Sequence, residues 1–239
     1  MRRALVTGGA GTIGAAICGC LARRGLHVIV HAHRDPARAL ELVEALRAEG
    51  GSAESVAFDV SEPAAATAGV GRLLEGGVIQ LLVHNAGITA DAPMAGMSDA
   101  QWSSVIGVSL NGFFHVARPL LLPMLRTRWG RIVAITSVAG IMGNRGQSNY
   151  AAAKAGLHGA VKSLAIEVAS RGVTVNAVAP GIIASNMAHK AFDDQAIGRL
   201  VPMARAGTPE EVANAVAFLC SDEASYVSGQ VLAVNGAMA

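Results

Sequence analysis

The 239-residue sequence has few cysteines, few aromatic residues and few charges, and each scarcity excludes a class of protein. Its three cysteines, Cys18, Cys20 and Cys220, form neither a CxxC pair nor a set suited to a disulfide framework. We expect them to be small buried side chains in a reducing compartment, and we expect no metal site. A net charge of +2 does not suit a nucleic-acid surface. We therefore expect a cytoplasmic protein with no nucleic-acid partner.

The sequence also lacks a long hydrophobic run, although 52% of its residues are hydrophobic and only 15% are charged. No segment reaches ~18 uninterrupted apolar residues, so no membrane association is expected. Arg2 and Arg3 resemble the start of a signal peptide, but glycines from Gly8 onward interrupt the apolar run and favour a first strand. The apolar excess instead fits strands that are buried on both faces and helices buried in an oligomer.

What the sequence does contain is a regular alternation of short apolar segments with helical ones. Strands are predicted at residues 4–7, 28–30, 55–58, 80–83, 131–136, 173–178 and 230–234. This alternation predicts an α/β fold: one Rossmann-like, doubly wound parallel sheet of about seven strands, flanked by helices on both faces. With no repeat or linker, residues 1–239 are expected to form a single dinucleotide-binding domain.

Two connecting segments stand out. Residues 99–125 are predicted to be helical, with kinks or interruptions at Pro119 and Pro123. Residues 182–207 have mixed polarity and contain Pro202 and two glycines, so we expect a mobile lid over the site. The apolar helices at 99–125 and 147–170 are candidates for a subunit interface.

The first predicted strand leads into a glycine-rich turn, Gly8–Gly14, and then into a helix. Glycines let the backbone approach a pyrophosphate, and the helix N-terminus supplies N–H donors and a favourable dipole. Taken alone, such a run is also compatible with a simple tight turn. Its position at the start of a βαβ unit favours dinucleotide binding.

The second predicted strand leads to His33 and Arg34 at the position that distinguishes the two nicotinamide cofactors. An acidic residue here would accept the ribose hydroxyls of NAD, whereas an arginine accommodates the 2′-phosphate of NADP. We therefore predict NADP(H). The alternative for Arg34 is a solvated flank of the next helix.

Further polar or glycine-containing segments follow the other predicted strands: Asp59, a candidate adenine contact, then Asn85–Gly87, Ser137 and Pro180–Gly181. Ligands of open α/β sheets bind at the carboxyl ends of the strands. The coincidence of these positions predicts one shared site.

Tyr150 and Lys154 are four residues apart on a helix predicted from about Ser148, so both side chains project from one face. A free tyrosine titrates near ~10, and a neighbouring ammonium lowers that pKa. The Ser137 hydroxyl could hold a carbonyl or alcohol oxygen beside the phenol. The pattern indicates acid–base catalysis by a phenol; the alternative is a surface helix with an unrelated pair.

Together these segments resemble the short-chain dehydrogenase/reductase family over essentially the whole chain. Thr7-Gly8…Gly14, Asn85-Ala86-Gly87, Ser137, Tyr150-x-x-x-Lys154 and Pro180-Gly181 match the family in identity, order and spacing. Within it, the chain is similar to bacterial 3-oxoacyl-[acyl-carrier-protein] reductases, through residues 138–156, 167–172 with Val175-Asn176, and 229–236. It is also similar to acetoacetyl-CoA reductases.

The resemblance implies a role for each catalytic residue. Tyr150 would donate a proton to the ketone oxygen while NADPH delivers hydride, Ser137 would polarise the carbonyl, and Lys154 would bind the nicotinamide ribose and lower the Tyr150 pKa. The implied cofactor contacts are Gly8, Gly11, Thr12, Ile13, Gly14, His33, Arg34, Asp59, Val60, Asn85, Ala86, Gly87, Tyr150, Lys154, Pro180, Gly181, Ile183 and Ser185.

The chain departs from the family pattern at a few positions. Thr12 stands where the family usually has a glycine, and Ser185-Asn186-Met187 where it commonly has Thr-Asp-Met. Ser109 occupies the place of the helix asparagine that anchors a proton-relay water, and Asn111 lies on another face. A serine can still hydrogen-bond a water, with shorter reach. The enzyme would then be slower, relay differently, or work beside a partner ketosynthase.

The leading hypothesis is an NADPH-dependent reductase of 3-oxoacyl thioesters on acyl-carrier protein. The alternatives are reduction of a CoA thioester or another carbonyl or alcohol substrate, and a cofactor-binding protein with little catalysis. Arg126, Arg128 and Arg131 would receive an acidic carrier protein, or else form a solvated loop. The family is usually tetrameric, so a homo-oligomer is expected.

Overall fold

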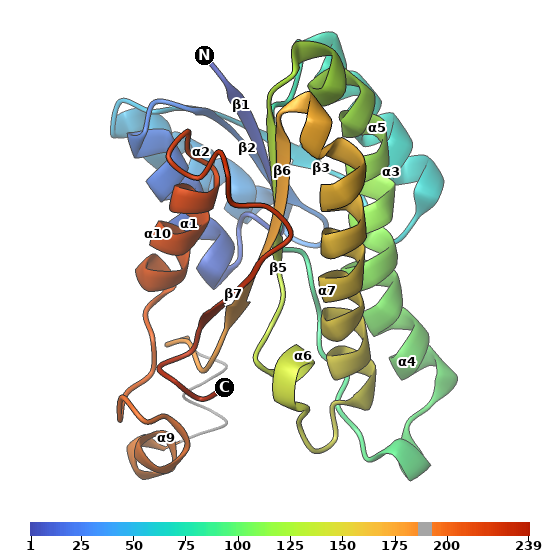
Figure 1. The fold of residues 1–239 in the computed structure, drawn as a ribbon, viewed down its shortest axis with the longest axis vertical. Coiled ribbons are helices and arrows are strands. Elements are labelled where there is room, and N and C mark those ends of the chain that lie inside the picture. Colours follow the sequence, from blue (N-terminus) through green and yellow to red (C-terminus); the bar gives the residue numbers. More distant parts are fainter. Residues whose placement is uncertain (186–192) are drawn as a thin grey trace.

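Seven short apolar runs form the strands of one parallel sheet (Figure 1). The computed structural model describes residues 1–185 and 193–239. The strands are β1 (Arg3–Thr7), β2 (His27–Ala32), β3 (Ser52–Ala57), β4 (Leu81–His84), β5 (Gly130–Ile135), β6 (Val173–Pro180) and β7 (Val231–Val234), in the order β3-β2-β1-β4-β5-β6-β7. The order reverses between β1 and β4, which creates the crevice expected of a doubly wound sheet. The predicted fold is confirmed.

Helices cover both faces of the sheet (Figure 1). On one face lie α1 (Thr12–Arg23), α2 (Pro36–Ala48) and α10 (Pro209–Leu219). On the other lie α3 (Pro63–Glu75), α5 (Gly112–Thr127) and α7 (Ser148–Val168), with α4 (Asp99–Ile106) beside α7. The remaining elements include three short segments, η1 (Met94–Gly96), α6 (Ala139–Met142) and η3 (Ala169–Arg171), and the helix α9 (Asp194–Leu200). A π-helical turn, η2, is described below.

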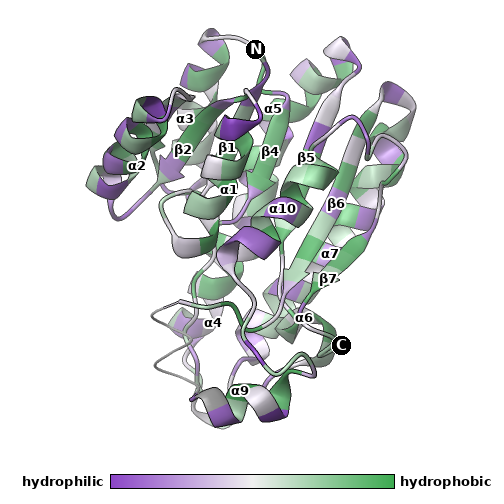
Figure 2. Ribbon diagram, turned by 90° about the vertical axis from the view of Figure 1, so that its left-hand side faces the viewer, coloured by the Kyte–Doolittle hydropathy of each residue, from purple (hydrophilic) through white to green (hydrophobic). Residues whose placement is uncertain are grey.

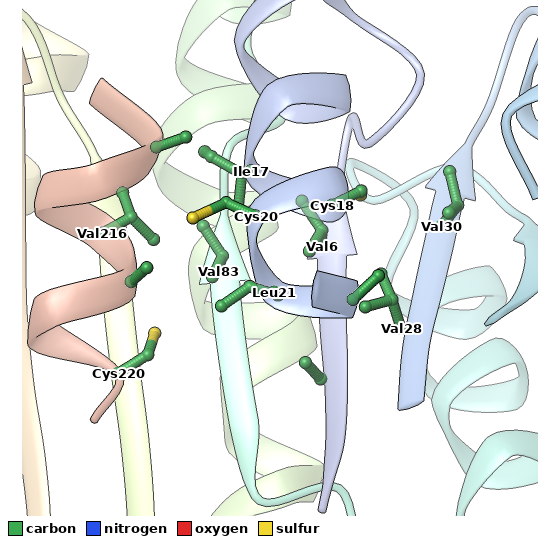
Figure 3. Packing of buried hydrophobic residues seen from close by; sticks show 14 of the residues in the cluster. Val6, Ile17, Cys18, Cys20, Leu21, Val28, Val30, Val83, Val216 and Cys220 are labelled. Atoms are coloured by element: carbon green, nitrogen blue, oxygen red, sulfur yellow. The ribbon is translucent and has the colours of Figure 1, made fainter. Parts of the chain in front are cut away.

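The central strands are buried on both faces because a helical layer covers each. Along β5, Val133 and Ile135 join the core beneath α1, while Ile132 and Ala134 join the core beneath α5 and α7. Figure 2 shows the strands as largely hydrophobic ribbons. In Figure 3, side chains of α1 fill the space between α10 and the strands. This two-sided burial accounts for the apolar excess of the sequence.

The three cysteines lie in the core around α1 and α10, as expected (Figure 3). Cys18, Cys20 and Cys220 are free and buried. Burial raises the pKa of the Cys220 thiol to about 12. These thiols therefore act as small apolar side chains.

The run from Asp99 to Thr127 is interrupted, but not at its prolines. Helix α5 continues through Pro119 and Pro123, and the break is a π-helical turn, η2 (Gly107–Asn111). The predicted interruption at the prolines is wrong. Both prolines lie on one half-buried side of α5, so the backbone hydrogen bonds that proline cannot donate are missing outside the core, where the helix tolerates their loss.

The same run is long and apolar enough, at mean hydropathy 1.4, to cross a membrane by length and composition alone. In this fold, Val116, Leu120 and Met124 are fully buried in the core of the second helical layer. Packing against the sheet therefore explains the apolar character of its inner face.

Candidate active site

The predicted site residues follow the carboxyl ends of the strands: Gly8 after β1, His33 after β2, Asp59 after β3, Asn85 after β4 and Ser137 after β5. Gly181 follows β6 in the same way. All strand pairs are parallel, so these ends share one edge of the sheet. The sheet therefore brings together the segments that the sequence analysis selected.

The glycine-rich turn is built to receive an anion. Gly8 adopts φ +60°, its N–H donates to His31 Nδ1 at 3.2 Å, and its carbonyl accepts from Asn85 Nδ2 at 2.9 Å. Gly11 caps α1 without a side-chain hydrogen bond, and the first turn of α1 carries no acidic residue. The first N–H groups of α1 are thus open to a phosphate. Thr12 is exposed at the start of α1, so its side chain does not obstruct the turn.

Gly14 is where this turn is packed most tightly. A Cβ there would overlap the Gly8 carbonyl oxygen and lie 2.8 Å from Gly9 Cα. We expect Gly14→Ala to destabilise the protein by about 1–3 kcal/mol and to weaken dinucleotide binding at least about tenfold, because the turn must open. Urea unfolding and a fluorescence titration would measure both. The control is Gly71→Ala in α3, where a Cβ meets nothing within 4 Å; equal behaviour of the two variants would contradict the expectation.

A cavity of about 280 Å³ lies beside this turn. Its lining residues come from the ends of β1, β2 and β4 and the start of α2: Gly8, Ala10, Gly11, His31, Ala32, His33, Asp35, Arg38, Asn85, Ala86 and Gly87. Arg34 is exposed but does not line the cavity, whereas Arg38, one turn along α2, does. Sequence analysis missed Arg38, because it lies in the first turn of α2 and not at the end of β2, where the cofactor-selecting residue was sought. The glycine turn, the open α1 N-terminus and the basic rim together fit a dinucleotide phosphate.

Asp59 and Val60 follow β3 at the same edge. Asp59 Oδ1 accepts from the Ser61 N–H at 2.8 Å and from its hydroxyl at 2.7 Å. Partial burial opposes ionisation, but these hydrogen bonds and the nearby His33 hold the pKa of Asp59 below its ordinary value. The Val60 side chain is buried and its carbonyl accepts from His115. Asp59 is therefore a carboxylate already engaged by Ser61.

The three catalytic candidates meet between β5 and α7. Ser137 follows β5, and its Oγ accepts from the Ala139 N–H at 3.1 Å. Tyr150 and Lys154 lie one turn apart on α7, with Lys154 Nζ 5.5 Å from the centre of the Tyr150 ring. Lys154 Nζ also donates to the Ile135 carbonyl at 2.8 Å, at the end of β5. The predicted shared face is confirmed.

Burial controls the protonation of this pair. It raises the pKa of Tyr150 above its ordinary value, while a hydrogen bond to Ser137 opposes the rise. Burial also lowers the pKa of Lys154 to about 8. The expected lowering of the Tyr150 pKa by Lys154 is therefore not found, because desolvation of the phenol dominates. Tyr150 is protonated at neutral pH, as a proton donor must be.

Ser109 lies in η2 and is fully buried, whereas Asn111 in the same turn is exposed. The position of a Cβ on Gly87 is 3.2 Å from Lys154 Nζ and 3.5 Å from Ser109 Oγ. The structure thus brings Ser109 close to Lys154, on the face that Asn111 does not share.

Asn149 is a buried polar residue beside Tyr150 that sequence analysis did not select. It is buried next to Tyr150, and its Nδ2 donates to the carbonyls of Ala90 and Gln101 at 3.0 and 3.1 Å. These bonds tie the first turn of α7 to the segment after β4. Its partners are distant in sequence, so no local pattern indicated this role.

The segment after β6 is joined to the end of β7. The Gly181 N–H donates to the Val234 carbonyl at 3.0 Å, and Ile183 forms a bridge with Gly207. Ser185 is the last described residue before residues 186–192. That part of the predicted 182–207 lid lies outside the described residues.

The proposed arginine cluster is only partly accessible. Arg131 is 2% exposed, its guanidinium packs 4.4 Å from the centre of the Trp129 ring, and its Nε donates to the Ser221 carbonyl at 3.0 Å. Its assignment to a docking surface is therefore wrong, because packing engages the guanidinium. Arg126 and Arg128 are exposed.

Comparison with known proteins agrees with this geometry. A family model described as enoyl-(acyl carrier protein) reductase matches residues 8–238. The 3-oxoacyl-[acyl-carrier-protein] reductase of Escherichia coli (strain K12) is 46% identical over 98% of this chain and 96% of its own, and that of Aggregatibacter actinomycetemcomitans is 42% identical over 98% of each. Nodulation protein G of Rhizobium sp. (strain N33) is 46% identical over 100% of this chain and 97% of its own. The chain belongs to the short-chain dehydrogenase/reductase family and is an oxidoreductase.

Proposed function

We propose that the protein reduces a 3-oxoacyl thioester on acyl-carrier protein to the 3-hydroxyacyl thioester, with NADPH as the reductant. The observation that carries this proposal is that burial keeps the Tyr150 phenol protonated next to Ser137 and the buried Lys154. These side chains lie at the same edge of the sheet as the glycine-rich turn and the cavity beside it. The printed activity of the reductases from E. coli and A. actinomycetemcomitans supports the choice of substrate.

The side chains divide the reaction between them. Bound NADPH supplies hydride to the ketone carbon. Tyr150 donates its proton to the ketone oxygen, and the Ser137 hydroxyl donates a hydrogen bond to the same oxygen. Lys154, whose Nζ lies 5.5 Å from the centre of the Tyr150 ring, would hold the nicotinamide ribose beside the phenol. Tyr150 must then recover a proton before the next turnover.

We attribute the choice of NADPH over NADH to His33 and Arg38, which line the cavity, and to the exposed Arg34, which lies between the lining residues His33 and Asp35 in the sequence. We expect Arg34→Glu/Arg38→Glu to raise KM for NADPH about 10–100-fold and to leave KM for NADH within about twofold, because only NADPH carries the 2′-phosphate. Initial rates with each cofactor measure this. Arg72→Glu, on α3, is the exposed control; an equal rise for both cofactors would contradict the assignment.

The substrate is tested by presenting the same short 3-oxoacyl group on acyl-carrier protein and on CoA. Faster NADPH oxidation with the carrier protein, reduced by Arg126→Glu/Arg128→Glu, would support the proposal. Turnover of the CoA thioester alone would move the assignment to the acetoacetyl-CoA reductase type. Tight NADPH binding without turnover of either substrate would indicate a binding protein.

We also infer a cytoplasmic homo-oligomer, a tetramer as is usual in the family, in which residues 182–207 form a lid over the site and a ketosynthase is a partner. Exposed Phe114 and Leu122 on α5 and Ile166 on α7 support a subunit interface, since 55%, 64% and 83% of their surfaces are exposed. Sedimentation velocity tests the oligomer: a monomer at micromolar concentration would refute it.

A further inference from the structure

A buried histidine lies beside the dinucleotide cavity, and the reaction described above gives it no part. His31, near the end of β2, is 2% exposed and belongs to the lining of that cavity. Its Nδ1 lies 3.2 Å from the Gly8 nitrogen, and its Nε2 lies 2.9 Å from the carbonyl oxygen of Phe58, which follows β3. The imidazole therefore bridges the glycine-rich turn and the end of β3.

The partners of His31 determine which ring nitrogen carries hydrogen. A carbonyl oxygen can only accept, so Nε2 donates to Phe58; a backbone N–H can only donate, so Nδ1 accepts from Gly8. Burial, with a smaller contribution from His33, lowers the pKa of His31 to about 4, although the Phe58 bond and Asp59 oppose the shift. The ring is therefore neutral, and it offers a phosphate neither a positive charge nor a free N–H.

The glycine-rich turn is held on two sides. On the β2 side, the Gly8 N–H donates to the imidazole and the Gly9 N–H donates to the His31 carbonyl at 2.8 Å. On the β4 side, the Gly8 carbonyl accepts from Asn85 Nδ2 at 2.9 Å. Loss of the imidazole would leave the Gly8 N–H without its partner and release one side of this peptide, just before the turn that leads to α1.

We propose that His31 is a positioning residue for the cofactor: its imidazole holds the glycine-rich turn against the end of β3, so that the phosphate cradle and the segment that begins at Asp59 receive one dinucleotide together. The inference rests on the dinucleotide cofactor of the proposed function, but not on its substrate. Because NADPH and NADH share the pyrophosphate that the turn would bind, His31 should affect both cofactors equally, unlike Arg34 and Arg38.

The other end of β2 offers a matched control. His27 also has both ring nitrogens engaged by β3, because its Nδ1 lies 2.7 Å from Ser52 Oγ and its Nε2 lies 3.1 Å from Glu54 Oε1. It lies at the amino ends of the strands, away from the cavity. His27→Leu and His31→Leu thus remove a comparable pair of hydrogen bonds from one strand, but only His31 contacts the glycine-rich turn.

The experiment measures the dissociation constants of NADPH and NADH by nicotinamide fluorescence, and kcat at saturating cofactor. We expect His31→Leu to raise both dissociation constants about tenfold, the effect of leaving one donor without its hydrogen bond, and to keep kcat within about twofold. His27→Leu should leave both dissociation constants unchanged, whatever its effect on stability. Unchanged constants in His31→Leu, an equal rise in His27→Leu, or a rise confined to NADPH would overturn the proposal.

Two amide variants separate the two ring bonds. The amide oxygen of asparagine lies as many bonds from the backbone as Nδ1 and can accept from Gly8, so His31→Asn should recover most of the cofactor affinity. The amide nitrogen of glutamine matches Nε2 in the same way and can donate to Phe58, so His31→Gln should recover less. Equal affinities in these two variants would overturn the proposal even where His31→Leu does not fold.

A readout without turnover separates this inference from the proposed function. In the cofactor-free protein, nitrogen-15 shifts of the His31 ring should report hydrogen on Nε2 and none on Nδ1 from pH 5 to 8. Hydrogen on Nδ1 would overturn the role of His31. A protein whose affinity for both dinucleotides depends on His31, but which reduces no 3-oxoacyl thioester, would refute the proposed function alone.

Discussion

Tyr150→Phe is expected to lower kcat for thioester reduction by at least about 10³-fold, because the only change is loss of the hydroxyl that donates the proton. Dinucleotide binding should stay within about twofold, since the aromatic ring and its packing remain. Stopped-flow NADPH oxidation and a binding titration would measure the two quantities separately.

The matched control is Tyr226→Phe, which alters the only other tyrosine, a fully exposed side chain. It should have wild-type kcat. Near-wild-type turnover in Tyr150→Phe would instead require another proton donor and would contradict the assignment of Tyr150 as the catalytic acid.

Lys154→Met should abolish most turnover and also change how stability depends on pH. The folded-state pKa of Lys154 is about 8, below the unfolded value of ~10.4, so the unfolded chain binds more protons between these values. The cost of burying the ammonium is therefore present in full below about pH 8 and disappears as the pH rises toward the unfolded pKa. Relative to Lys154→Met, the wild-type free energy of unfolding should rise by about 2–3 kcal/mol between pH 7 and pH 10.

Urea unfolding of the cofactor-free proteins at the two pH values measures this difference. Lys162→Met removes an exposed lysine from the same helix and should show the same pH dependence as wild type. A parallel pH dependence in wild type and Lys154→Met would mean that the buried amine does not change its charge in this range.

Features that depend on short sequence distances were predicted well. Tyr150 and Lys154 share a face of α7 because four residues make about one helical turn. The strand and helix order followed from periodicity, and parallel strands then placed Ser137 and the glycine turn at one edge. Local chemistry and topology were sufficient for these positions.

Features that depend on the partner of a buried polar group were predicted poorly. Arg131 was expected in a docking surface, yet Trp129 and the Ser221 carbonyl engage it in the fold. Asn149 gave no signal because its partners lie 59 and 48 residues away. Pro119 and Pro123 were expected to kink or interrupt the helical run, but α5 continues through both, and the interruption is the π-helical turn η2.

By itself, the sequence determined the fold, the edge of the sheet proposed to bind the cofactor, and the candidate pair Tyr150 and Lys154, because these follow from hydrophobic period, glycine spacing and one helical turn. Only the tertiary structure decided the protonation of Tyr150 and Lys154 and the partner of Ser109. Those properties depend on how far each group is removed from water and on which atom from another strand or helix lies within hydrogen-bond distance. Neither quantity is encoded locally: the Ser109 carbonyl, for example, accepts from His84 Nε2 only because β4 packs against η2.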